Sequence, residues 1–155
     1  MPEDFRSRPF MIDPGPVSGD RPASCRKRVP LSNVLVILCV DDEQTGLTAR
    51  RLLLSIAGYT VLTATSGTTA LRLFNCNHVD LVITDHLLPD FTGAELALHM
   101  KQRKPEVPVV LLTGLVDPPP GSEHADLLLT KGMMPQQFLA DVAKLISKSE
   151  SAGAD

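Results

Sequence analysis

Apolar runs that alternate with helical segments constrain the fold of this chain most strongly. The runs are short and rich in Val, Leu and Ile, which is typical of strands buried on both faces. We predict strands over residues 34–40, 59–64, 81–84, 107–112 and 126–130. Because strands that alternate with helices form parallel sheets with right-handed crossovers, the pattern predicts an α/β domain with a five-stranded parallel sheet.

The segments between these runs carry helix signals. In the first, Ala49, Leu52, Leu53 and Ile56 follow i, i+3, i+4, i+7 spacing, so we expect this face to be buried. Ser66 is suited to cap the second helix, and Pro135 to stand in the first turn of the last. We predict helices over residues 44–57, 67–76, 93–104 and 135–148.

The crossover before the last strand is abnormal. It spans residues 113–125 and contains three consecutive prolines, Pro118 to Pro120. Proline removes a backbone donor and clashes with the preceding helical turn, so this run cannot lie inside a helix. A helical crossover usually needs at least about 10–12 residues. We therefore expect the fourth helix to be very short or replaced by a Pro-rich loop.

The two ends of the chain differ in composition from its middle. Residues 1–30 hold six of the 13 prolines, and six Lys/Arg against four Asp/Glu. They show no periodicity, which is typical of a disordered segment. We predict a disordered Pro/Arg-rich arm over residues 1–32, one folded domain over 33–148, and a disordered tail over 149–155.

Composition narrows the functional classes. The net charge of −3 argues against a generic nucleic-acid binder, because such proteins carry a basic surface. No apolar run approaches the roughly 20 residues of a membrane span. The three cysteines form no recognisable disulfide or metal-binding pattern, which favours the reducing cytoplasm. Oligomeric state is open between a monomer and a weak dimer.

Polar side chains stand where four of the predicted strands end. Asp41 and Asp42 follow the first strand, Asp85 the third, Thr113 the fourth and Lys131 the fifth. Parallel strands align their carboxyl ends along one edge, where ligands bind. A single Asp after a strand is more often a helix cap or turn former. The ordered occurrence of all five residues is what predicts one shared pocket.

This group of side chains suits a divalent cation and a phosphoryl group. Mg²⁺ prefers oxygen ligands and commonly takes one or two carboxylates together with water and phosphate oxygens. Asp42 and Asp85 could bind it directly, and Asp41 could hold a metal-bound water. An aspartate can also attack phosphorus and form an acyl phosphate. Lys131 and Thr113 could then bind the oxygens of the transferred group.

With these residues, the chain over about 33–148 resembles the receiver domains of bacterial two-component response regulators. The resemblance is carried by residues 34–43, Gly58-Tyr59, residues 80–85, Pro89 and Gly93, residues 108–113, and Lys131. It implies a flavodoxin-like, doubly wound sheet with strand order 2-1-3-4-5. It also implies a signalling module that catalyses at most its own phosphorylation and dephosphorylation.

The resemblance assigns a role to each residue of the pocket. Asp85 would accept phosphate from a histidine kinase or a phosphotransfer protein. Mg²⁺ would be bound by Asp41, Asp42, Asp85 and the backbone carbonyl of Leu87. Thr113 and Lys131 would be the switch hydroxyl and the lysine of the family pattern.

Three departures from the family pattern bear on switching. Gly132 stands where the family usually has the proline that follows the lysine, and Leu128 stands at the position of the switch aromatic. The Pro-rich crossover replaces part of the usual output face. The resemblance also implies that the residues two past the phosphoacceptor and two past the threonine flank the path of the attacking water. Here they are Leu87 and Leu115, and neither can orient a water by hydrogen bonding, so we predict slow self-dephosphorylation.

Three functional hypotheses follow. The first is a stand-alone phosphorylatable receiver that signals by protein–protein contact, because only about seven residues follow the predicted last helix. The second is a degenerate receiver that binds a partner without phosphorylation, as the departures at Gly132 and Leu128 favour. The third is an aspartyl-phosphate phosphohydrolase. That class needs an acid two residues after its nucleophile, where this chain has Leu87, so it is the weakest.

Overall fold

The computed structural model describes residues 34–114 and 117–153, and its centre is a single parallel sheet. The strand order is β2-β1-β3-β4-β5, as the sequence predicts for a doubly wound flavodoxin-like fold. The strands are β1 (Val36–Val40), β2 (Thr60–Ala64), β3 (Leu81–Asp85), β4 (Val109–Thr113) and β5 (Leu127–Thr130). All five residues of β3 and of β4 are buried, which explains why these runs lack the alternation of a half-exposed strand.

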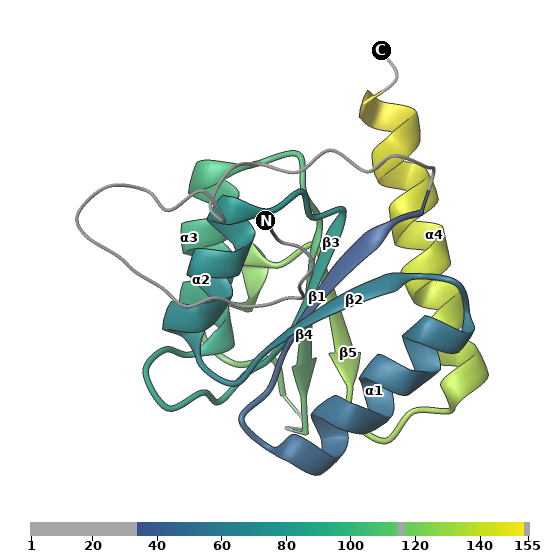
Figure 1. Cartoon of the computed structure of the whole chain (residues 1–155). Coiled ribbons are helices and arrows are strands. Elements are labelled where there is room, and N and C mark those ends of the chain that lie inside the picture. Colours follow the sequence, from purple (N-terminus) through teal and green to yellow (C-terminus); the bar gives the residue numbers. More distant parts are fainter. Residues whose placement is uncertain (1–33, 115–116, 154–155) are drawn as a thin grey trace, which may run out of the picture.

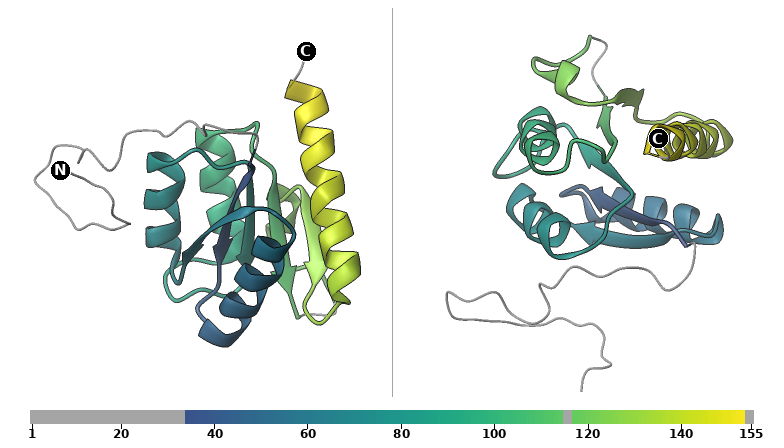
Figure 2. Two further views of the ribbon diagram at one scale, coloured as in Figure 1. Left: turned by 45° about the vertical axis from the view of Figure 1, so that its right-hand side comes forward. Right: turned by 90° about the horizontal axis from the view of Figure 1, so that it is seen from above.

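Within the described parts of the chain, four α-helices cover the two faces of the sheet. They are α1 (Gln44–Ile56), α2 (Gly67–Cys76), α3 (Gly93–Arg103) and α4 (Pro135–Gly153). Figure 1 shows α2 and α3 on one side of the strands and α1 and α4 on the other. The view from above in Figure 2 separates the three layers. This arrangement leaves the carboxyl ends of the strands on one edge of the sheet.

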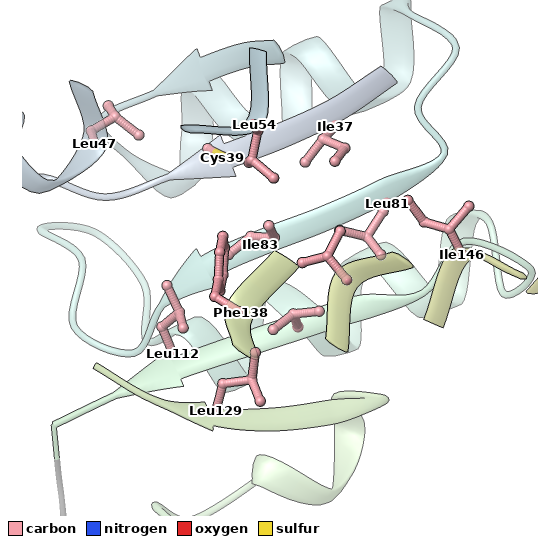
Figure 3. Close-up of a cluster of buried hydrophobic side chains, with 12 residues drawn as sticks. Ile37, Cys39, Leu47, Leu54, Leu81, Ile83, Leu112, Leu129, Phe138 and Ile146 are labelled. Atoms are coloured by element: carbon pink, nitrogen blue, oxygen red, sulfur yellow. The ribbon is translucent and has the colours of Figure 1, made fainter. Parts of the chain in front are cut away.

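Each face of the sheet has its own apolar core. Toward α1 and α4, the strand residues Ile37 and Ile83 pack with Leu54 of α1 and Phe138 of α4 (Figure 3). Toward α2 and α3, the fully buried Phe74 lies in a second cluster. Burial of these side chains supplies the main driving force that holds the strand ends in register.

The buried face of α1 differs from the predicted face. Leu47 and Leu54 are its fully buried residues, whereas Ile56 is 84% exposed and Leu52 is 49% exposed. Two apolar registers overlap on this helix, because leucines also stand at 47 and 54. The structure buries the second register and leaves Arg50 on the same side as Leu47 and Leu54.

Two further regions test the predicted boundaries. The crossover between β4 and β5 contains no α-helix within its described residues, and one 3₁₀ turn, η2 (Ser122–His124), takes its place, as the prolines predict. The last helix continues to Gly153, so the prediction of a disordered tail from residue 149 was wrong for most of that segment. The predicted arm over residues 1–32 lies outside the described residues.

The hydropathy of the helices and the state of one cysteine complete the description of the fold. Among the described helices, none combines the length and apolar character of a membrane span. Cys39 is a free, buried thiol whose pKa burial raises to about 12.

Candidate functional site

The sheet brings the predicted site residues to one edge. Asp85 is the last residue of β3 and Thr113 is the last residue of β4, while Asp41 and Lys131 directly follow β1 and β5. The register aligns Asp85 with Leu112, the neighbour of Thr113. Lys131 is fixed to the same edge because its backbone N–H donates to the carbonyl of Thr113 at 2.9 Å. Thr113 itself is buried.

Among the residues that the structure describes, three carboxylates meet in this pocket. Asp41, Asp42 and Asp85 each offer an oxygen, and these oxygens all lie within 4.8 Å of one another. Asp41 is 1% exposed and Asp85 is 7% exposed, whereas Asp42 is open to solvent. Two buried carboxylates and one exposed carboxylate at this spacing repel one another, and a divalent cation with oxygen ligands would relieve that repulsion. The donor set therefore fits Mg²⁺.

Lys131 supplies a positive charge to the same group. Its Nζ lies 2.8 Å from Asp85 Oδ1 and 3.7 Å from Asp41 Oδ2. Partial burial lowers the pKa of Lys131, but the hydrogen bond to Asp85 and the charges of Asp85 and Asp41 outweigh this and raise it. Lys131 is therefore an ammonium ion at neutral pH. Gly132, which follows it, adopts a φ of +90°, a backbone conformation that residues other than glycine rarely take.

The loop after β3 is braced on both sides. Leu87, whose carbonyl is the expected metal ligand, forms an isolated antiparallel bridge with Thr92, and its side chain is 65% exposed. Thr92 caps α3 in a capping box with Glu95. Asp90 binds the start of α2, where it accepts hydrogen bonds from the backbone N–H groups of Gly67 and Thr68. These contacts restrain the segment that carries the Leu87 carbonyl.

Arg50 belongs to the pocket, although the sequence analysis did not include it. Its guanidinium forms an ion pair with Asp41 through Nη2 and Oδ2, and its side chain is 18% exposed. The signal was present in the sequence, because a basic residue stands between Leu47 and Leu54 on one helical face. A basic residue on a face that packs against the sheet needs a buried acid as its partner.

Known proteins share this fold and sequence pattern. Residues 37–143 match the family model described as the response regulator receiver domain. The chain belongs to the response regulator receiver family. The alkaline phosphatase synthesis transcriptional regulatory protein PhoP of Bacillus subtilis is 34% identical over 120 residues, which cover 75% of this chain and 50% of PhoP.

Solved structures of receiver domains have a fold similar to that of this chain. A response regulator receiver domain from Clostridium thermocellum is 34% identical and superposes with a TM-score of 0.71, covering 77% of this chain and 99% of that one. The response regulator TrrA of Thermotoga maritima, solved in complex with Mg²⁺ and BeF, is 31% identical with a TM-score of 0.69, covering 72% and 99%.

The chain spans about half the length of PhoP, the curated relative described above. Receivers are signalling modules of two-component systems, and the same kind of domain also matches in larger proteins. The sensor kinase/phosphatase LuxN of Vibrio campbellii is 32% identical over 78 residues, which are 50% of this chain and 9% of LuxN. The expectation that this receiver stands alone therefore stays a prediction.

Proposed function

We propose that this receiver accepts a phosphoryl group on Asp85 in a Mg²⁺-dependent reaction and signals by contact with another protein. The observation that carries the proposal is the position of Lys131 Nζ, 2.8 Å from Asp85 Oδ1, in a pocket that also holds the carboxylates of Asp41 and Asp42. An acceptor carboxylate, a fixed cation and a set of oxygen ligands are the parts that phosphoryl transfer to aspartate requires.

In the proposed reaction, a carboxylate oxygen of Asp85 attacks the phosphorus of a phosphohistidine on a histidine kinase or phosphotransfer protein. A bond from phosphorus to Asp85 forms, the bond from phosphorus to the imidazole breaks, and the electron pair returns to the imidazole. Lys131 and Thr113 bind oxygens of the transferred group. Asp42, Asp85 and the Leu87 carbonyl, with Asp41 beside them, would hold Mg²⁺, and the ion would neutralise part of the phosphoryl charge.

The proposal predicts a phosphorylated protein without any kinase, because small phosphodonors can deliver the same group. The protein is incubated with acetyl phosphate and Mg²⁺ and read by intact mass. The wild type gains one phosphoryl group, and Asp85→Asn gains none. Asp141→Asn serves as the matched control, because it removes an acid on α4 that accepts a hydrogen bond from Gln137 and is not one of the three clustered carboxylates. Incorporation that persists in Asp85→Asn contradicts the proposal.

A degenerate receiver that binds its partner without phosphorylation is the second candidate function. It is favoured by Gly132 at φ +90° after the lysine. It is also favoured by the 3₁₀ turn η2, which replaces an α-helix among the described residues of the crossover between β4 and β5. Leu128 stands at the expected position of the switch aromatic. It has no aromatic ring that could move together with Thr113. This candidate predicts no mass gain in the same assay, at a phosphodonor concentration where another receiver reacts fully.

We also propose a cytoplasmic location, because the phosphodonors named above transfer phosphate inside the cell. Separation of cells into cytoplasmic and envelope fractions, followed by immunoblotting of the protein, tests the location. Recovery of the protein outside the cytoplasmic fraction would contradict it.

A further inference from the structure

Arg50 is a partly buried cation inside the acidic pocket. It stands three residues after Leu47 and four before Leu54, so α1 directs it toward the sheet along with these two buried leucines. There its guanidinium pairs with Asp41, which is 1% exposed. Buried charges of this kind are stable only when they are paired, so each residue depends on the other in the absence of metal.

Both oxygens of Asp41 already accept contacts from the protein. Oδ1 accepts the backbone N–H of Glu43 at 2.9 Å, and Oδ2 pairs with Arg50 and lies 3.7 Å from Lys131 Nζ. Two fixed cations, Arg50 and Lys131, therefore face three carboxylates. The positive charge of the Arg50 guanidinium, which is paired with Asp41, repels a second cation at the same carboxylate oxygens.

We propose that Arg50 is an internal competitor of the divalent cation at Asp41 and sets the metal concentration that the site requires. The inference rests on the metal site of the proposed function. A bound Mg²⁺ either shares Asp41 with the guanidinium or displaces it, and both lower the affinity. In the absence of metal, the same pairing compensates the buried charge of Asp41 and so stabilises the folded protein.

Metal titration tests the competition directly. MgCl₂ is titrated calorimetrically into the wild type, Arg50→Met and Arg51→Met. Arg50→Met keeps an unbranched apolar stem on the helix and removes the charge, so we expect its dissociation constant for Mg²⁺ to fall at least tenfold. Arg51 is the matched control, because it is the next residue on α1 and is exposed. We expect Arg51→Met to stay within twofold of the wild type.

Thermal unfolding separates this role from simple packing. Without metal, Arg50→Met leaves Asp41 buried and poorly paired, so its melting temperature should fall. Because a ligand stabilises the folded state according to its affinity, saturating Mg²⁺ should raise the melting temperature of Arg50→Met more than that of the wild type. Arg50→Lys keeps a charge and should lie between the two. Loss of a merely structural contact would lower the melting temperature equally with and without Mg²⁺, and this result would overturn the inference.

The wild type gives an independent answer if Arg50→Met does not fold. The side-chain NMR signal of Arg50 should shift on saturation with Mg²⁺, and an unchanged signal overturns the inference. Equal, measurable Mg²⁺ affinities in the wild type and Arg50→Met overturn the competition alone. Absence of Mg²⁺ binding in both proteins overturns the competition and the metal site of the proposed function together.

Discussion

Gly93 is the position where one added methyl group should disturb the site most. It is the first residue of α3 and lies directly against the end of β3. A Cβ at this position would lie 2.3 Å from the backbone oxygen of Asp85, 2.5 Å from Leu111 Cδ1 and 3.0 Å from His86 Cα. The Asp85 oxygen also accepts the hydroxyl of Thr84 at 3.0 Å, so this carbonyl belongs to a fixed part of the sheet.

The size of the effect follows from which atom is in the way. Overpacking a well-packed site typically costs about 1–3 kcal/mol. Replacing Gly by Ala returns at most about 1 kcal/mol of helix propensity, and less at a helix terminus. Because a backbone carbonyl cannot rotate away as a side chain can, we expect Gly93→Ala to lose about 2 kcal/mol of unfolding free energy. With a urea slope of about 1–3 kcal/mol per molar, the midpoint should fall by about 1 M.

Urea unfolding followed by far-ultraviolet circular dichroism measures this change. Gly114→Ala is the matched control, because it lies just after Thr113 at the same edge and its added Cβ would meet no atom within 4 Å. We expect its unfolding free energy to change by less than about 0.5 kcal/mol. Equal midpoints for Gly93→Ala and Gly114→Ala would refute the reasoning that close approach of α3 to Asp85 requires glycine.

Three further predictions concern the surroundings of the site. The pKa of Asp90 is lowered to about 2, mainly by the hydrogen bond from the Thr68 hydroxyl, so its contribution to stability is present above its ordinary pKa of 3.8 and is lost as pH falls toward 2. The unfolding free energy of Asp90→Asn should therefore fall less with acidification than that of the wild type, and parallel curves of unfolding free energy against pH would contradict this. Phe74→Ala should lose about 3–5 kcal/mol of unfolding free energy, measured by urea unfolding, because Phe74 is a fully buried side chain of α2. A loss below about 1.5 kcal/mol, the size expected for a volume-conserving exchange of core residues, would show that neighbouring side chains fill the cavity. Leu87→Asn should shorten the lifetime of the acyl phosphate severalfold, because the asparagine side chain can hydrogen-bond the attacking water. An unchanged decay rate, measured by intact mass, would contradict the prediction that Leu87 keeps self-dephosphorylation slow.

Much of the fold could be predicted from local patterns. The apolar runs locate all five strands to within two residues, because strands buried on both faces need continuous apolar sequence. Ser66 caps α2 as its residue type predicts, and the three prolines account for the absence of an α-helix from the described residues of the crossover between β4 and β5. These features depend on a few neighbouring residues, so the sequence alone carries them.

The buried face of α1 and the length of α4 could not be predicted in the same way. Two apolar registers overlap on α1, and only packing against β1 and β3 selects the one with Leu47 and Leu54. Helix α4 continues to Gly153, beyond the predicted end at residue 148. Helix ends carry weaker sequence signals than helix centres, because they have no periodic apolar face.

The sequence by itself determined which strand-end residues meet in the pocket and which edge of the sheet holds them, because parallel strands fix where their carboxyl ends meet. Tertiary structure alone decided how the charges in that pocket are paired. Arg50 lies nine residues after Asp41 and on another element, so only the packing of α1 on the sheet brings the guanidinium to the buried carboxylate. A charge pattern along the chain gives composition, whereas ion pairing depends on distance and burial, and both are properties of the folded protein.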